Sequence, residues 1–372
     1  MLGRRLYSAS VLITIRVDTI LLYEGVKMKL TTTKIAELAG VSRGAVDKTI
    51  HNRPGVREDV RRRILQVIEE TGYVPLAERK KERVQIADKT VAVILPRLTN
   101  PYFAVLKRYM EEICMFMPAL HLQFYPCDTT NVRELLTILD ELADNPIDGY
   151  LFRGVRSEQV REKLDEQKRP VIFFDSDVSG ANRLCMVGED CVKSGRIAAS
   201  LLAKSIGYRG QAAVISGSID IPSHQQRLNG FYDVMRAEYP EIQIVRQFYT
   251  QEQSAVAYQQ ATRLLEDFPQ LAGVCNLAGC SGEIGQAILE RRAKQAVSLV
   301  CFGTAADVTA LIRKKIVTFA INLQPREQAR ILLETMYGYL TQGKQPENAF
   351  IHTPIAIALD ENMDMLTRDF GE

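Results

Sequence analysis

The 372-residue sequence lacks the residue clusters on which metal and disulfide chemistry depend. Its seven cysteines are odd in number and form no CxxC pair, so neither a disulfide framework nor a zinc site is indicated, and a reducing cytosol is expected. The histidines, His51, His121, His224 and His352, lie far apart, which argues against a metal cluster or a histidine-based triad. We therefore expect no metal site and no cofactor.

The sequence also has little that suits a membrane. One candidate run, VLITIRVDTILL at 11–22, is interrupted by Arg16 and Asp18 and is shorter than the roughly 20 residues of a spanning helix. No small-residue cleavage site follows it, so a signal peptide is not indicated either. We interpret residues 1–29 as a poorly ordered extension, with Met28 as a plausible natural start, and expect a cytoplasmic protein.

Signatures of common enzymes are absent as well. No G-x-G-x-x-G or GxxxxGK[ST] phosphate loop follows any expected strand, and no candidate nucleophile has a base beside it. Apolar residues make up 46% and charged residues 25%, which is an ordinary soluble composition. The length favours two or three compact units. We expect a soluble globular protein that is not an enzyme.

Charge is distributed unevenly along the chain. Residues 28–83 carry 13 basic and 8 acidic side chains, a net charge of +5. Residues 84–372 carry 30 basic and 35 acidic side chains, a net charge of −5. A basic head on an acidic body is typical of a protein that meets a polyanion with one end only.

The basic head has the pattern of a helix-turn-helix. Ile35, Ala36 and Ala39 recur at helical spacing, and Gly40 can take the positive φ of a turn. Ser42 can cap a second helix whose Val46 and Ile50 face the first. A third helix is expected from about residue 58 to 70. We assign residues 30–77 to a small, all-α DNA-binding domain.

Residues 30–75 resemble the DNA-binding head of the lactose/galactose-repressor family. The matching positions are Ala39, Gly40, Val41 and Ser42 at the turn, and Gly72, Tyr73 and Pro75 at the close. The resemblance implies that the second helix lies in the major groove, with Arg43 reading a guanine and Gly44 approaching the bases closely. It places phosphate contacts at Thr31, Ser42, Lys48, His51 and Asn52.

Three positions depart from the family pattern. Asp47 stands where a serine is usual, and we expect it to pair with Arg43 or Lys48. Arg57 replaces the usual cap of the third helix. In the hinge, residues 78–89, Glu82 occupies the slot of the leucine that wedges into the minor groove, which puts DNA bending in doubt.

The body, residues 90–372, alternates strand and helix patterns. Short β-branched runs at 91–96, 122–126, 149–153 and 171–175 are separated by helical stretches, and a second such series follows from 212 to 322. This order predicts an α/β fold with two doubly wound, parallel-sheet lobes. We place the N-lobe at about 90–190 and 323–350, and the C-lobe at about 191–322 and 351–372. Ligands of such folds bind beyond the carboxyl ends of the strands.

The body resembles the periplasmic sugar-binding-protein fold, and ribose-type binders in particular. Through that resemblance Asn100, Tyr102 and Phe103 contact a sugar ring, Asp175 accepts hydroxyl bonds, and Arg227 forks onto ring oxygens. Gln324 matches a polar residue near the hinge. Asn276 and Ser281 stand where relatives carry an asparagine-aspartate pair, and Ser176 replaces an arginine.

Together these patterns predict a ligand-responsive transcriptional regulator, in the main a repressor. Its partners are a pseudo-palindromic DNA operator, a sugar or polyol effector, and a second copy in a homodimer. The alternative is an exported sugar-binding protein of a transport system, since its fold would match the body. The presence of a helix-turn-helix pattern and the lack of an indicated signal sequence count against that alternative.

Overall fold

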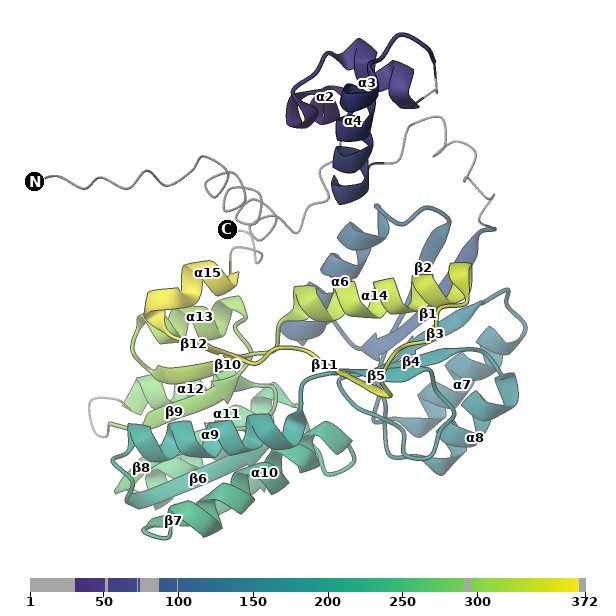
Figure 1. Ribbon diagram of the computed structural model, residues 1–372. Helices are drawn as coiled ribbons and strands as arrows, with labels where there is room; N and C mark the ends of the chain where they lie inside the picture. Colours follow the sequence, from purple (N-terminus) through teal and green to yellow (C-terminus); the bar gives the residue numbers. More distant parts are fainter. Residues whose placement is uncertain are drawn as a thin grey trace, which may run out of the picture. The chain divides into compact units, whose positions relative to one another are not determined.

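The computed structural model describes residues 31–50, 53–71, 73, 87–98, 100–291 and 296–367. The chain divides into two units, residues 1–85 and 86–372 (Figure 1). The predicted extension at 1–29, and hinge residues 78–86 with Glu82, lie outside the described residues. No helix within the described ranges is both long and apolar enough to cross a membrane.

The described part of the first unit consists of three helices, as predicted: α2 (Thr32–Ala39), α3 (Arg43–Ile50) and α4 (Glu58–Thr71). Gly40 ends α2 in the left-handed region at φ 62°, and its N–H bonds to the carbonyls of Ala36 and Glu37. One small core joins the helices, made of Ile35, Ala36, Ala39, Val46, Ile64 and Tyr73. Because Ala36 is small, α2 and α3 can approach closely, which is the geometry of a helix-turn-helix.

The N-lobe of the second unit is one six-stranded sheet in the order β11-β5-β4-β3-β1-β2. Every pairing in it is parallel. The strands are β1 (Lys89–Pro96), β2 (Leu120–Cys127), β3 (Gly149–Phe152), β4 (Val171–Phe174), β5 (Cys185–Gly188) and β11 (Phe350–His352). The helices are α6 (Pro101–Cys114), α7 (Val132–Ala143), α8 (Glu158–Gln167) and α14 (Pro325–Gln342).

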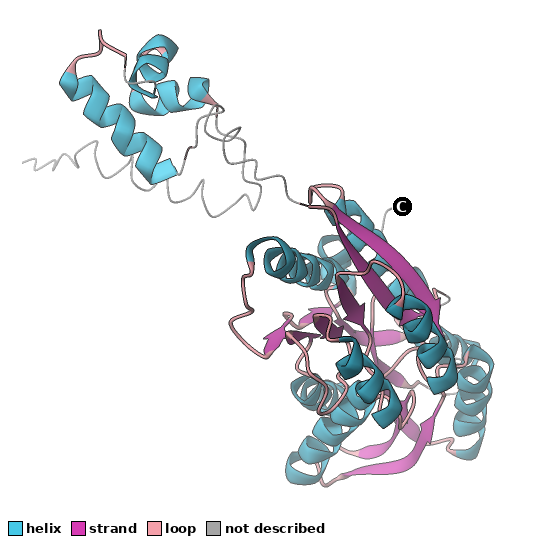
Figure 2. Cartoon of the chain, turned by 90° about the vertical axis from the view of Figure 1, so that its right-hand side faces the viewer, coloured by secondary structure: helices cyan, strands magenta, loops and turns pink. Residues whose placement is uncertain are grey.

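Alternation along the N-lobe strands explains the helical layers on both sides of the sheet (Figure 2). Val91 and Val93 of β1 pack with α6 and α14, whereas Ala92 and Ile94 pack with α7 and α8. Since successive side chains of a strand point to opposite faces, a fully apolar strand has to be covered twice. This burial on both faces confirms the predicted doubly wound arrangement.

The C-lobe repeats this plan with the strand order β12-β10-β9-β8-β6-β7. Its strands are β6 (Gly210–Ser216), β7 (Ile242–Tyr249), β8 (Leu271–Asn276), β9 (Ser298–Phe302), β10 (Val317–Asn322) and β12 (Ala356–Ala358). Its helices are α9 (Cys191–Ser205), α10 (Pro222–Glu238), α11 (Ser254–Asp267), α12 (Ser281–Arg291), α13 (Ala306–Arg313) and α15 (Met363–Thr367), with a 3-10 turn at Asp360–Asn362. One edge differs from the expected parallel sheet, because β12 runs antiparallel to β10.

The described chain passes between the lobes three times: between β5 and α9, between β10 and α14, and between β11 and β12. The last passage comes slightly later than expected, since β11 keeps the chain in the N-lobe sheet as far as His352. Parallel strands all end at the same edge, so the carboxyl ends of each sheet gather polar loop residues at one edge of each lobe.

Candidate functional site

A cavity of about 80 Å³ lies between the two lobes. Six of the residues predicted to bind an effector line it: Asn100, Tyr102, Phe103, Asp175, Arg227 and Ser281. An outer cavity of about 500 Å³ adjoins it and shares Asn100, Glu252, Cys280 and Asp307 with it. The charged and polar lining that sequence reasoning missed comprises Arg153, His224, Glu252 and Asp307.

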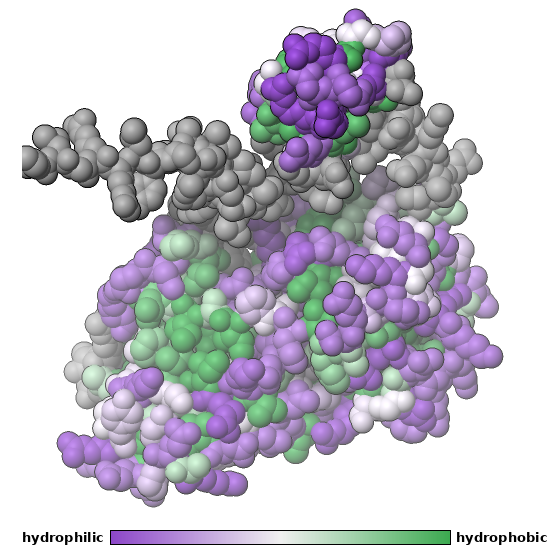
Figure 3. Space-filling view, in the orientation of Figure 1, coloured by the Kyte–Doolittle hydropathy of each residue, from purple (hydrophilic) through white to green (hydrophobic). Residues whose placement is uncertain are grey.

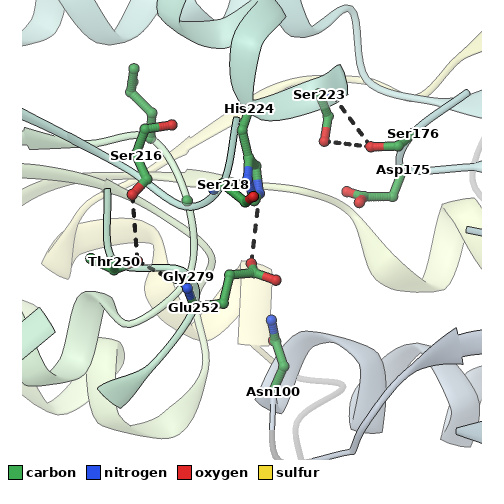
Figure 4. Close-up of polar contacts among 12 residues, drawn as sticks. Asn100, Asp175, Ser176, Ser216, Ser218, Ser223, His224, Thr250, Glu252 and Gly279 are labelled. Atoms are coloured by element: carbon green, nitrogen blue, oxygen red, sulfur yellow. Dashed lines mark hydrogen bonds and ion pairs between the residues drawn. The ribbon is translucent and has the colours of Figure 1, made fainter. Parts of the chain in front are cut away.

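Asn100 is the N-cap of α6 and points its amide nitrogen into the cleft (Figure 4). Its Oδ1 accepts a hydrogen bond from the backbone N–H of Tyr102 at 3.1 Å, capping the helix, while Pro101 occupies the first turn. The Tyr102 hydroxyl donates to Gln328 of α14 at 2.5 Å, and burial raises the pKa of Tyr102 well above its usual range. Tyr102 can therefore offer a ligand its ring, but the proton of its hydroxyl is already donated to Gln328.

Asp175 follows β4 and is held by a buried arginine. Arg153 Nε donates to Asp175 Oδ2 at 2.7 Å, and a second nitrogen of Arg153 donates to Thr129 at 2.9 Å. The Arg153 guanidinium lies 5.6 Å from the Phe103 ring centroid and is only 1% exposed. Asp175 itself has a φ of 59°, a strained backbone for a residue other than glycine. This ion pair fixes the Asp175 carboxylate at the cavity wall.

Arg227, on α10, forms the second buried ion pair. Its Nε donates to Glu189 at 2.6 Å, another nitrogen donates to the carbonyl of Leu277 at 3.0 Å, and its guanidinium lies 4.4 Å from the Phe302 ring centroid. Close packing of α9 and α10 positions the arginine. A Cβ on Gly195 would lie 2.0 Å from the Arg227 carbonyl oxygen, so α9 fits against α10 only with glycine there.

His224 and Glu252 form a third polar pair in the cleft (Figure 4). The backbone N–H of Ser218 donates to His224 Nδ1 at 3.0 Å, so the neutral ring carries its proton on Nε2, which lies 3.6 Å from Glu252 Oε1. Burial, together with repulsion from Arg153 and Arg227, lowers the pKa of His224 well below its usual value. Burial raises the pKa of Glu252. The histidine is therefore neutral and provides no positive charge for the carboxylate.

Two serines join the lobes beside this pair. Ser176 Oγ lies 2.7 Å from Ser223 Oγ and accepts a bond from the Ser223 backbone N–H at 3.3 Å (Figure 4). Both serines are 1% exposed. Ser176, which replaces the arginine of ribose-type binders, thus links the end of β4 to the start of α10.

Two of the residues predicted to face an effector, Asn276 and Gln324, are not among the described residues that line the cavity. Asn276 is fully buried and donates to the carbonyls of Ala278 and Gly279 and to Ser281 Oγ, so its amide shapes the loop before α12. Gln324 lies on the second interlobe passage at φ 51°, before Pro325. Its neighbour Leu323 belongs to the described cavity lining, whereas Gln324 does not.

The head presents a polar surface on α3. Arg43, Gly44 and Lys48 are exposed. Asp47 was expected to pair with Arg43 or Lys48, and this prediction is wrong, because its carboxylate lies 3.5 Å from Arg53. Ser42 Oγ and Thr31 Oγ1 accept backbone N–H bonds from Ala45 and Lys34, both at 3.3 Å, so each caps a helix. His51 and Asn52 lie outside the described residues.

Arg57 does not act as an ordinary cap of α4. Its guanidinium pairs with Asp59 in the first turn of the helix at 2.9 Å, on an exposed surface. The acidic side chains of that turn suit the positive end of the helix, so the substitution leaves the helix start with a favourable charge.

Two family models match separate parts of the chain. Residues 31–75 match the bacterial regulatory proteins of the lacI family, and residues 91–345 match a periplasmic binding protein domain. Among solved structures, a solute-binding protein from Burkholderia graminis in complex with D-arabinose superposes with a TM-score of 0.69. It is 18% identical, over 75% of this chain and 97% of that one. A solute-binding protein from Agrobacterium vitis bound to α-D-tagatopyranose superposes with a TM-score of 0.69. It is 21% identical, over 76% of this chain and 98% of that one. These likenesses show the fold.

Curated relatives match across much of the chain. Catabolite control protein A of Streptococcus mutans is 26% identical over 63% of this chain and 69% of its own length. The ribose operon repressor of Bacillus subtilis is 24% identical over 58% of this chain and 63% of its own length. The repressor PurR of Histophilus somni is 26% identical over 55% of this chain and 61% of its own length. The chain thus spans about 61 to 69% of the length of these relatives. With its helix-turn-helix head and periplasmic-binding-protein body, the chain belongs to the lacI family of bacterial regulatory proteins.

Proposed function

We propose that this protein is a transcriptional repressor whose affinity for an operator responds to a sugar or sugar-like polyol bound between the lobes. The observation that carries the proposal is the joining, in one chain, of a lacI-type head to a buried cleft lined by paired charges and aromatic rings. Polyols suit such a lining, because hydroxyls need both donors and acceptors while C–H faces need apolar plates. The relatives named as operon repressors support the same reading.

The head supplies the DNA-binding surface. In this proposal Arg43 reads a guanine, Gly44 allows close approach, and the remaining predicted residues contact phosphates: Thr31, Ser42, Lys48, His51 and Asn52. Because an operator is the target, the protein works in the cytoplasm, and it has a binding function and no enzymatic one. A transport protein is disfavoured, since it has no use for a helix-turn-helix.

The effector acts by linkage. Residues from both lobes line the cavity, so a ligand that touches both favours one arrangement of the lobes over the other. In a homodimer that arrangement sets the spacing of two heads on a pseudo-palindromic operator. Apolar side chains gather on the C-lobe face that carries β12, where Ile357 remains 36% exposed (Figure 3), and a second copy could cover such a patch.

The test is a thermal-shift screen of the full-length protein against pentoses, hexoses and cyclitols, followed by operator binding with each hit. We expect a hit that also changes operator affinity. A complete absence of hits among these polyols would contradict the proposed effector class, and hits without any effect on DNA binding would contradict the linkage.

A conservative variant sharpens the test. Asn100→Ser keeps a hydroxyl that can cap α6 but removes the amide nitrogen aimed into the cavity. We expect the melting temperature without ligand to stay near that of the wild type while effector affinity falls up to about tenfold, the value of one neutral hydrogen bond. Unchanged effector affinity would remove Asn100 from the contact set.

A further inference from the structure

Each arginine that lines the inner cavity is already neutralised by its own carboxylate. Arg153 pairs with Asp175, and Arg227 pairs with Glu189, whose side chain is only 6% exposed. Among the described residues that line the cavity there is no lysine and no further arginine. At the outer cavity Arg97 is likewise engaged, donating to both Glu134 oxygens at 3.1 Å. Among the described residues that line the two cavities, every arginine is thus paired with a carboxylate.

The carboxylates of the cleft are in excess. Glu252 and Asp307 line both cavities, and Glu283 lines the outer one. Among the described ion pairs, none joins any of these three to a lysine or arginine. Glu252 Oε1 lies 3.6 Å from the neutral His224. The positive groups that also act on its carboxyl, Arg153 and Arg227, are each paired with another carboxylate. The lining of the cleft therefore carries a net negative charge.

Glu252 reaches its place by a strained backbone. It and Gln251 are consecutive non-glycine residues in the left-handed region, at φ 54° and 52°. A Cβ added at Gly279 would lie 3.4 Å from Glu252 Oε1 and 3.6 Å from Asn100 Nδ2. An acceptor from the C-lobe and a donor from the N-lobe thus flank the same stretch of bare backbone (Figure 4), as recognition of a hydroxyl requires, while the acceptor alone suits an amine.

Two of the helix starts at the cleft, those of α12 and α13, are also unsuited to phosphate. The positive N-terminal end of a helix is a common phosphate site. Here Asp307 lies in the first turn of α13 and Glu283 in the first turn of α12, so carboxylates already meet these two helix dipoles. Cys280 lies among these acids, and burial together with Glu283, Glu252 and Asp307 raises its pKa to about 12.

We propose that the cleft selects an effector without negative charge, either a neutral polyol or an amine-bearing sugar, and rejects sugar phosphates and sugar acids. Glu252 is the residue that sets this specificity. The inference deepens the proposed function and rests on it, since it names the charge class of ligand that the same site takes.

Cys280 allows a test that needs no knowledge of the effector. It is partly exposed and lines both cavities. Methanethiosulfonate reagents with a cationic or an anionic tail react with a thiolate in the same way: its sulfur attacks the sulfenyl sulfur, a disulfide forms and methanesulfinate leaves. The rate ratio of the two reagents at Cys280, located by peptide mass spectrometry, reports the sign of the local potential.

The reference is the same cysteine in urea-unfolded protein. We expect the cationic-to-anionic rate ratio in the folded full-length protein to exceed the unfolded ratio by at least about tenfold, as unit charges near a partly exposed group produce. Glu252→Gln should lower the ratio at least about threefold. The matched control Glu238→Gln, exposed at the far end of α10 about 24 Å along the helix from its start, should leave it unchanged. An equal or reversed ratio, or no effect of Glu252→Gln, overturns the inference.

Matched ligands give the second arm. Ribose is compared with ribose 5-phosphate, and glucose with glucose 6-phosphate and glucosamine, by thermal shift. A phosphate that binds more tightly than its parent sugar overturns the inference, whatever the thiol rates show. Because the reagent rates need no effector, a negative cleft that binds none of the polyols would refute the proposed function alone.

Discussion

The arginines of the two units are used in opposite ways. Arg43 of the head is exposed and makes no hydrogen bond or ion pair with another described residue. Arg153 and Arg227 of the body are at most 4% exposed, and each is held by a carboxylate and by an aromatic face. An arginine that awaits a polyanion is left free, whereas one that frames a small ligand is fixed before the ligand arrives.

The difference has an energetic consequence. An exposed, unpaired side chain contributes little to folding, so its removal shows mainly in binding. A buried ion pair contributes little net stability as a pair, but removal of one partner leaves the other as an uncompensated charge. Substitutions in the head should therefore change DNA affinity, and substitutions in the cleft should change both stability and ligand response.

The largest expected effect comes from breaking the buried pair. Arg227→Ala should destabilise the body by about 3–5 kcal/mol, because Glu189 is left charged and buried. Urea unfolding of the full-length protein measures this loss. The double substitution Arg227→Leu with Glu189→Leu should cost less than the sum of the single substitutions, since no charge remains to be buried. Additive costs would contradict the view that each partner exists to neutralise the other.

Arg43→Ala should have the converse effect. Specific operator affinity should fall by about 1–3 kcal/mol, the value of a bidentate guanine contact. Protection of the α2 and α4 amides from hydrogen exchange should stay unchanged. Arg57→Ala is the matched control, because it removes the same charge from an exposed arginine that is paired with Asp59. Equal losses of specific and non-specific binding in both variants would remove base reading from Arg43.

The two units also differed in how far they could be predicted from sequence. The head could be predicted almost entirely, because its turn is local: Gly40, Ser42 and the apolar residues of α2 lie within a dozen positions of one another. The strands and helices with clear periodicity were predicted equally well. Strands β11 and β12 were missed because runs of three residues carry no period. Strand β5 was missed because only one of its four residues, Val187, is β-branched or aromatic.

Helices α9, α13 and α14 were not predicted either, and α9 was missed for a different reason. Its buried residues include Gly195, Ala198, Ala199 and Ala203, and such small side chains give a weak apolar stripe. The same smallness lets α10 approach and set the position of Arg227. The feature that concealed the helix in the sequence is therefore the one that builds the site.

The cleft could be predicted only in part, because its residues converge from distant loops. Arg153 had a usable signal, since it ends the expected strand at 149–153, but Glu252 and His224 had none of this kind. For Asn276, the end of a strand showed where the residue lies but not that Ala278 and Ser281 accept bonds from its amide. Contacts between the lobes depend on tertiary structure, which the periodicity of a sequence does not predict.

A smaller effect concerns pH. His224 has a lowered pKa when folded, so below about pH 6.5 the unfolded chain takes up a proton that the folded chain does not. Stability should therefore be lost as pH falls through this window, by up to about 1.4 kcal/mol per pH unit for this group. Glu252 acts in the opposite sense, because its raised pKa lets the folded chain take up a proton first.

Two variants separate these contributions. His224→Gln keeps an acceptor for the Ser218 N–H, and its melting temperature should fall less than that of the wild type between pH 7 and 5. Glu252→Gln should make the fall steeper. His121→Gln, at an exposed position beside Asp88, serves as the control. If the melting temperature of His224→Gln fell with pH as steeply as that of the wild type, the buried ring would not be the titrating group.

The smallest effect tests whether one head residue has two roles. Thr31 caps α2 through its bond to Lys34, and it is also predicted to face a phosphate. Thr31→Ala should weaken α2 by about 1 kcal/mol, seen as faster hydrogen exchange across residues 32–39. Thr31→Asp should keep the cap and the exchange rates but weaken operator binding, most strongly at low salt, because a carboxylate would face the phosphates. Thr31→Ser retains the hydroxyl, which can both cap α2 and contact a phosphate, and is the control. Operator affinity of Thr31→Asp equal to that of the wild type would leave Thr31 as a cap alone, and would confine the phosphate contacts of α2 and α3 to Ser42 and Lys48.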